Sequence, residues 1–250
     1  MVVVVSDTFL VKYGNSVKEI EGWNLLFVEQ YLKIPAPRLY AMFQESGEIF
    51  LVMEYIRGNL LRDVWPTLEE RDKMTIVGKL KGILYSMRSL PSPGYFGNVL
   101  RGPFSDEFFW SMSSDPSISG PFRSGNELCS ALVAKLKSNS EDPSKVEFFK
   151  THLPQLLGRH PPTFTHTDLQ QENIIVQEID HGQLRDYKVF IIDWEDAGWF
   201  PSYWEYASLF IGFHWRDDWL AKAEHFVDPW PAEAAMMKFV YMQLALYCNC

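Results

Sequence analysis

The chain has 250 residues, of which 47% are hydrophobic and 22% are charged, and its formal net charge is −9. This length suffices for one large domain or for two lobes with buried cores, and the composition is that of an ordinary globular protein. The acidic balance, without any basic stripe along the chain, argues against a nucleic-acid-binding surface. The charge is compatible with a cationic or metal-bound ligand, and solubility alone accounts for it equally well.

The cysteines Cys129, Cys248 and Cys250 are too few for a disulfide framework, and their spacing is not that of a metal site. Such a chain is typical of a reducing compartment. The valine run at residues 2–5 is too short for a signal peptide or a membrane span. We therefore expect a cytoplasmic protein with no membrane partner and no nucleic-acid partner.

The first part of the chain predicts a small sheet with one helix packed on it. Residues 1–14 indicate two strands with a turn at Ser6 and Asp7. Apolar residues recur at helical spacing over residues 17–31, and the prolines that follow end this helix. Residues 38–56 then predict a hairpin that turns at residues 45–47.

After residue 57 the pattern becomes mainly helical. We expect a helix over residues 67–90, an ordered aromatic-rich surface loop over 91–123, and helices over 126–138 and 143–157. A hairpin that turns near His181 and Gly182, a strand over residues 188–194, and helices from Ser202 onward complete the chain. The boundary between the two lobes is expected near Arg57 and Gly58.

One loop concentrates small polar residues between two apolar segments. His166, Asp168 and Asn173 follow the pattern H-x-D-x-x-x-x-N, and a second apolar segment delivers Asp193 at its carboxyl end. If the two segments pair as a hairpin, Asn173 and Asp193 lie near one another at the same end of the sheet. An acid and an amide oxygen are ligands that Mg²⁺ accepts, which leaves Asp168 to receive or orient a hydroxyl proton. This arrangement indicates phosphoryl transfer.

A single buried histidine is more often a structural hydrogen-bonding group than a catalyst, and we expect His166 to brace the loop. A solvated loop would not need both the fixed offsets of Asp168 and Asn173 and the terminal acid Asp193 of the second strand. Taken together, these residues favour a functional site over an ordinary loop.

The loop motif, followed by “IIDWEDAG” at residues 191–198, resembles the aminoglycoside phosphotransferase family, which includes the choline-kinase-like enzymes. The sequence between residues 164 and 206 is especially similar to that of fungal proteins with this domain. The resemblance covers essentially the whole chain. It implies an α+β, protein-kinase-like fold with a β-rich N-terminal lobe, residues 1–57, and a larger, mainly helical C-terminal lobe, residues 58–250. It also implies ATP and Mg²⁺ as cofactors.

The resemblance assigns roles to individual residues. In “FLVKYG”, Lys12 corresponds to the lysine that contacts the nucleotide phosphates, and Glu21 is the expected partner of that lysine. In “LVMEYIRG”, the backbone groups of Glu54 and Ile56 are expected to hold the adenine edge. Taken alone, Lys12 would be read as an exposed strand lysine and Glu21 as an ordinary helix-face acid. Asp168 is the expected base, and the magnesium ligands are expected to be Asn173 and Asp193.

The acceptor is expected to be a small molecule with a hydroxyl group, and a cationic one suits the acids and aromatic residues after Asp193. The candidate acceptor residues are Glu195, Asp196, Trp199 and Glu205. The alternative is that the aromatic residues fill the core and that Glu205 braces the lobe.

No glycine-rich hairpin precedes the expected lysine strand, so the nucleotide-binding sheet is expected to be incomplete. Two functions stay open: an ATP-dependent small-molecule phosphotransferase, and a catalytically impaired kinase-like binding module. A protein kinase is a weaker third alternative, because the run from Asp193 to Tyr206 is short for an activation loop.

Overall fold

The structure is a computed structural model that describes residues 1–111, 115–139, 142–180, 185–211 and 217–245. It forms two compact units, each assembled from several stretches of the chain. The first unit comprises Met1–Ser89, Asp168–Glu195 and Asp217–Val227, and the second comprises Leu90–Thr167, Asp196–Arg216 and Asp228–Cys250. The lobe boundary expected near Arg57 and Gly58 stays a prediction.

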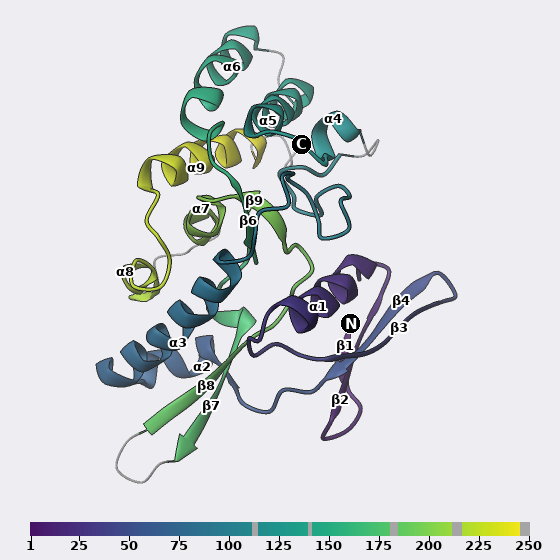
Figure 1. Ribbon diagram of the computed structural model, residues 1–250, viewed down its shortest axis with the longest axis vertical. Coiled ribbons are helices and arrows are strands. Elements are labelled where there is room, and N and C mark those ends of the chain that lie inside the picture. Colours follow the sequence, from purple (N-terminus) through teal and green to yellow (C-terminus); the bar gives the residue numbers. More distant parts are fainter. Residues whose placement is uncertain (112–114, 140–141, 181–184, 212–216, 246–250) are drawn as a thin grey trace. The chain divides into compact units, whose positions relative to one another are not determined.

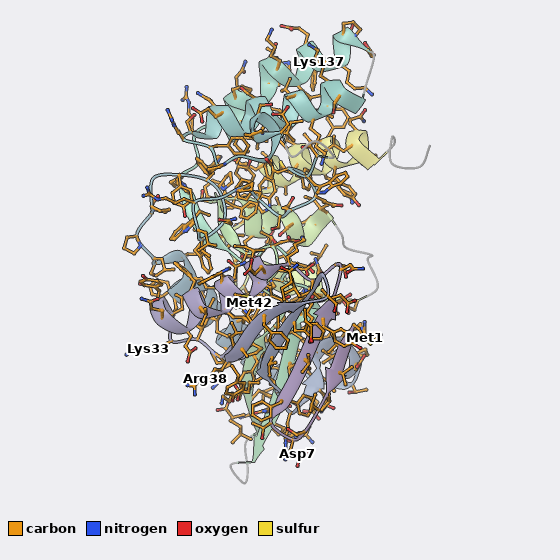
Figure 2. The ribbon with its side chains drawn as sticks, turned by 90° about the vertical axis from the view of Figure 1, so that its right-hand side faces the viewer. Met1, Asp7, Lys33, Arg38, Met42 and Lys137 are labelled. Atoms are coloured by element: carbon orange, nitrogen blue, oxygen red, sulfur yellow. The ribbon has the colours of Figure 1, made fainter. Side chains whose placement is uncertain are left out.

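The first unit contains a four-stranded antiparallel sheet with the order β1-β2-β4-β3. Its strands are β1 (Val2–Val4), β2 (Phe9–Gly14), β3 (Leu39–Glu45) and β4 (Glu48–Glu54). Both predicted hairpins are present, with Asp7 at the tip of the β1–β2 hairpin (Figure 2). Helix α1 (Glu19–Tyr31) packs on one face of the sheet, as the helical spacing predicts (Figure 1).

A glycine allows this helix to approach the sheet closely. A Cβ atom at Gly22 would lie 3.2 Å from Leu51 Cδ2 and even closer to the sulfur of Met42. Leu25 and Val28, on the same helix, are buried in the core between the helix and the sheet. This tight packing holds the start of α1 against the middle of the sheet.

The rest of the first unit is a smaller antiparallel sheet with helices beside it. The sheet has the order β5-β7-β8, with β5 (Asn59–Leu60), β7 (Ile174–Asp180) and β8 (Arg185–Ile191). Helix α3 (Glu70–Arg88) packs against β8 (Figure 1). The short elements are α2 (Leu61–Val64), the 3-10 helices η1 (Trp65–Thr67) and η2 (Gln171–Asn173), and α8 (Trp219–Ala223).

The second unit is mainly helical. Its helices are α4 (Pro116–Ser119), α5 (Gly125–Asn139), α6 (Pro143–Leu157), α7 (Trp204–Ile211) and α9 (Pro231–Ala245). A two-stranded sheet pairs β6 (Pro162–Thr165) with β9 (Gly198–Pro201), and β9 was not predicted. Aromatic side chains hold the loop that precedes α5, since the rings of Phe104 and Phe200 lie 4.1 Å apart.

The helices predicted over residues 126–138 and 143–157 are confirmed as α5 and α6. The strand predicted over residues 188–194 ends at Ile191 instead. The turn predicted at His181 and Gly182 lies outside the described residues. Within the part of the chain that the structure describes, every helix is too short or too polar to cross a membrane.

Candidate active site

The ammonium group of Lys12 lies among three carboxylates of the first unit. Its Nζ atom is 2.8 Å from Glu21 Oε2, 2.7 Å from Asp193 Oδ1 and 3.3 Å from Glu195 Oε2. One oxygen from each acid lies within 4.8 Å of the others. The structure therefore brings Lys12 and Glu21 together, as the resemblance implies, and places Asp193 and Glu195 beside the same ammonium group.

Strand β2 and helix α1 place the first two of these residues. Lys12 pairs with Leu51 in the centre of the sheet, and Glu21 lies in the first turn of the helix that covers this face. Burial raises the pKa of Glu21 to about 7, although the ammonium group of Lys12 opposes this shift. Burial acts to lower the pKa of Lys12, but the carboxylates of Glu21 and Asp193 outweigh burial and raise that pKa above its ordinary value. Lys12 therefore keeps its positive charge.

Asp193 reaches the cluster because the backbone turns after β8. Ile192 still donates its N–H to the carbonyl of Asn173 at 2.9 Å, which continues the pairing of β7 and β8 by one step. Asp193 then adopts a φ of +63°, in the left-handed region that a strand cannot contain. Strain of this kind persists where the surrounding contacts hold it, and here the ammonium group of Lys12 does so. The predicted strand was too long for this reason.

Asn173 and Asp168 are linked directly. Asn173 Nδ2 donates to Asp168 Oδ2 at 2.7 Å and to the backbone carbonyl of Asp168 at 2.9 Å. Asn173 ends the 3-10 helix η2, and its carbonyl pairs with the residue before Asp193. The two residues predicted as metal ligands thus lie at the same end of the β7–β8 hairpin. The amide of Asn173 orients the carboxylate of Asp168, which is the residue expected to act as the base.

A cavity of about 150 Å³ adjoins the cluster. Lys12, Glu21 and Asp193 form one part of its lining, and Glu54 and Ile56 form another. The remaining walls are mainly apolar and include Leu10, Met53, Ile175 and Ile192. The cavity thus has apolar walls, a backbone segment after β4 and a charged cluster at one side, and its volume suits a planar ring system better than a whole nucleotide.

The oxygen-rich donor set fits a hard divalent cation. Asp193 and Glu195 offer carboxylate oxygens, and Asn173 offers an amide oxygen at the same end of the hairpin. The ammonium group of Lys12 now contacts both acids. A cation bound by Asp193 would therefore compete with Lys12 for its carboxylate.

His166 belongs to the second unit, where it has a structural contact. Its backbone N–H donates to Glu205 Oε2 at 2.8 Å, and both residues are buried. Glu205 lies in the first turn of α7. This contact ties the loop before Asp168 to a helix through the side chain of Glu205, whereas the role expected for the imidazole of His166 stays a prediction.

The remaining candidate acceptor residues lie in different surroundings. Glu195 contacts Lys12, and Trp199 is buried on β9, where its ring lies 5.5 Å from that of Phe164. Asp196, in the second unit, is half-buried. The role of these residues in binding the acceptor stays a prediction. For Trp199, which is buried, the alternative that its ring fills the core fits better.

Asn24 also supports the site, although it was not predicted to do so. This fully buried residue of α1 donates its Nδ2 to the carbonyl of Trp194 at 2.7 Å, which fixes the backbone between Asp193 and Glu195. Its position three residues after Glu21 places both side chains on one helix face. This spacing was the feature of the sequence that could have indicated Asn24 as a neighbour of the site.

Comparisons with known proteins show the family and the fold of the chain. Residues 23–237 match the family model described as the phosphotransferase enzyme family. A comparison with curated protein sequences found no match.

Several solved structures are similar to this chain. Aminoglycoside phosphotransferase APH(4)-Ia, a thermostable mutant in a ternary complex with AMP-PNP and hygromycin B, is 17% identical with a TM-score of 0.61, over 98% of this chain and 80% of that one. A candidate fructosamine-3-kinase from Haemophilus somnus 129PT is 14% identical with a TM-score of 0.59, over 96% and 74%. Aminoglycoside phosphotransferase APH(3'')-Id from Streptomyces rimosus ATCC10970 is 15% identical with a TM-score of 0.56, over 95% and 85%. These likenesses confirm the predicted α+β, protein-kinase-like fold.

Proposed function

The chain belongs to the phosphotransferase enzyme family, and from this we propose that it transfers the γ-phosphate of ATP to a hydroxyl group of a small molecule. The observation that carries the proposal is the contact of Lys12 with both Glu21 and Asp193 beside an apolar-walled cavity. A lysine steadied by a helix acid, next to an acid that can hold a metal, is the arrangement that kinase-like phosphoryl transfer requires.

The adenine of ATP is proposed to lie between the apolar walls of the cavity, with the rest of the nucleotide extending past the charged cluster. The backbone of Glu54 and Ile56 would meet the polar edge of adenine, and the ammonium group of Lys12 would meet the phosphates. Glu21 holds Lys12 in place, because its carboxylate lies 2.8 Å from the lysine and is fixed on α1.

Mg²⁺ is proposed to be held by Asn173 and Asp193, with Glu195 close to the same position. The ion, when bound, would neutralise charge on the phosphates. The Ile192–Asn173 hydrogen bond brings the residue before β7 and the turn after β8 together at this site.

Asp168 is proposed as the base that accepts or orients the acceptor's hydroxyl proton. The amide of Asn173 donates to its carboxylate at 2.7 Å and so fixes the direction in which the other lone pairs point. The His166–Glu205 contact supports the preceding part of this loop.

The acceptor is proposed to be a small hydroxyl compound with a positive charge, which Glu195 and Asp196 would attract. The similar structures include aminoglycoside phosphotransferases, one of them with hygromycin B, and a candidate fructosamine kinase. We also propose a cytoplasmic location, which the cysteine usage supports.

A catalytically impaired binding module is the second candidate function. It is favoured by the additional contact of the Lys12 ammonium group with Glu195, because a lysine that engages this third carboxylate is less available to a phosphate.

Phosphate transfer from radiolabelled ATP to a panel of amino sugars, quaternary amino alcohols and neutral alcohols separates the two candidates. The phosphotransferase should label at least one acceptor, and Asp168→Asn should reduce the rate at least about 100-fold while the affinity for AMP-PNP is kept. Binding of Mg²⁺ and ATP without transfer to any acceptor would favour the binding module. Transfer that survives Asp168→Asn would show that Asp168 is not the base.

A further inference from the structure

The first unit contains a second cavity, of about 350 Å³, at the side of α3 that faces β8. Residues 33–35, which follow α1, form one wall of this cavity. The carbonyl of Pro35 accepts a hydrogen bond from the N–H of Ile191 on β8. None of its lining residues belongs to the cavity proposed for the nucleotide. It is therefore a separate place on the molecule.

The floor of this second cavity is apolar. It is formed mainly by Ile34, Pro35, Ile83, Ile179, Tyr187 and Val189. Ile83 and Val189 are buried, so they form the bottom, while Gly82 and Ser86 lie on the exposed side of α3. An apolar floor under an open mouth would bury the hydrocarbon part of a ligand.

The rim is positively charged. Lys33, Lys79 and Lys188 come from three different segments and line the same cavity, in a chain whose net charge is −9. Lys79 forms an ion pair with Asp186 at 3.0 Å. Within the described part of the chain, neither Lys33 nor Lys188 forms an ion pair. The side chain of Lys33 projects outward at the margin of the molecule (Figure 2).

The third lysine is held in place by an aromatic ring. Lys188 Nζ lies 4.5 Å from the ring centroid of Phe190, within the range of a cation–π contact. Lys33 and Lys188 thus bring two positive charges to the lining without an ion pair of their own. Of the nearby acids, Asp186 is paired with Lys79, and Asp72 and Glu178 share Arg185, so a local excess of positive charge remains that an anion would neutralise.

We propose that this second cavity binds a small organic anion, with an apolar body on the floor and a carboxylate or phosphate group among the lysines. The volume is near the lower end of the range for ligand sites, so the ligand is small. The rim offers lysines and no arginine, and compact ammonium charges accept either head group without requiring paired, planar hydrogen bonds.

Calorimetric titration of the whole chain, without nucleotide, tests this proposal. The probes are octanoate and octyl phosphate, and 1-octanol and octylammonium are the neutral and cationic controls with the same hydrocarbon body. At least one anion should bind with one-to-one stoichiometry and at least about tenfold more tightly than 1-octanol, and added salt should weaken it. Binding of only one of the two anions supports the proposal and identifies the head group.

Two kinds of variant locate the bound probe. Gly82→Leu should fill the cavity and weaken binding at least about tenfold, because a side chain at Gly82 meets no atom within 4 Å as it leaves the helix. Gly78→Leu is the matched control, since Gly78 lies on the same helix, has the same open surroundings and does not line the cavity. Both changes favour the helix, so neither should unfold it.

The double change Lys33→Met and Lys188→Met removes charge but keeps the length of both side chains, and it should weaken binding to a similar degree. Lys81→Met, an exposed position of α3 outside the lining, should leave binding unchanged. The proposal is overturned if neither anion binds the parent chain, if 1-octanol binds as tightly as the anions, or if Gly82→Leu binds like Gly78→Leu. The titration contains neither ATP nor acceptor, so its result is independent of the proposed phosphotransferase activity.

Discussion

Lys12 Nζ lies 2.7 Å from Asp193 Oδ1, although 181 positions separate the two residues in the chain. The contact joins β2, whose Lys12 is proposed to meet the phosphates, to the turn after β8, whose Asp193 is proposed to hold the metal. A cation bound at Asp193, as we propose, would compete with the ammonium group of Lys12 for this carboxylate and would free Lys12 to contact the phosphates. In that case metal binding would favour nucleotide binding.

Replacing Lys12 by Met should abolish most of the affinity for magnesium-bound AMP-PNP. The change removes the only positive charge in contact with Glu21, Asp193 and Glu195 among the described ion pairs, so the phosphates would meet three uncompensated acids. We expect a loss of at least about tenfold in affinity by calorimetry. Lys137→Met, at an exposed position of α5, is the control and should bind like the parent. Equal affinity in Lys12→Met would show that Lys12 does not contact the phosphates.

Asp193→Asn should remove the metal-dependent part of thermal stabilisation by nucleotide. Mg²⁺ and AMP-PNP together should raise the unfolding temperature of the parent chain, because a ligand that binds the folded state stabilises it. The variant should lose that rise while its unfolding temperature without ligand stays close to that of the parent, since Asp193 also helps to raise the pKa of Glu21 and its removal relieves crowding of like charges. Asp63→Asn, at an exposed position, is the control. A full metal-dependent rise in Asp193→Asn would contradict the assignment.

Glu205→Ala should destabilise the second unit by about 1–3 kcal/mol, because it leaves the buried N–H of His166 without the acceptor that lies 2.8 Å away. Glu205→Gln keeps an oxygen at the same distance along the side chain and should cost less. Denaturant unfolding gives the free energy of unfolding of both variants, and the loss should be larger for Glu205→Ala than for Glu205→Gln. A variant Glu205→Ala as stable as Glu205→Gln would show that the contact does not brace the loop.

The free energy of unfolding should fall as the pH rises toward neutral. Burial, with a smaller contribution from the charge of Asp196, raises the pKa of Asp106 from 3.8 to about 7 in the folded chain. A carboxyl group with a raised pKa binds its proton more tightly when folded, so its contribution to stability is complete below pH 3.8 and is lost as the pH rises through about 7. Glu21, whose pKa is also raised to about 7, acts in the same direction.

Asp106→Asn should reduce this pH dependence without abolishing it, because Glu21 remains. The amide can keep the hydrogen bond that Asp106 Oδ1 accepts from the N–H of Phe108 at 2.8 Å. The gain in stability above neutral pH should be at most about 4 kcal/mol. Denaturant unfolding between acid and neutral pH measures it, and an unchanged slope in Asp106→Asn would contradict the raised pKa.

Local sequence patterns were enough to predict most of the helices and strands. The helix on the first sheet and the two hairpins follow from the spacing of apolar residues and the turn residues between them, which act over a few positions. The strand before Asp193 was predicted too long, because nothing in “KVFIIDW” shows that Asp193 takes a left-handed backbone. The strand β9 was missed because its pairing with β6 joins segments that are distant in sequence.

The site was only partly predictable. The motif around Asp168 and Asn173 and the acid Asp193 could be found by their offsets, and the pairing of Lys12 with Glu21 came from the family resemblance. Glu195 was expected near the acceptor, yet it lies 3.3 Å from Lys12. Asn24 was not predicted, because its position three residues after Glu21 is a weak signal that also fits a polar surface residue of a helix.

Residue types at short, fixed spacings were enough to predict the family, the α+β class and candidate residues for the chemistry. Three features could be seen only in the folded chain: which acids share the charge of Lys12, how Asn173 orients Asp168, and where a lysine-rimmed cavity forms beside α3. These contacts join segments up to 183 positions apart. They are set by how sheets and helices pack, and spacing along the chain does not encode this directly.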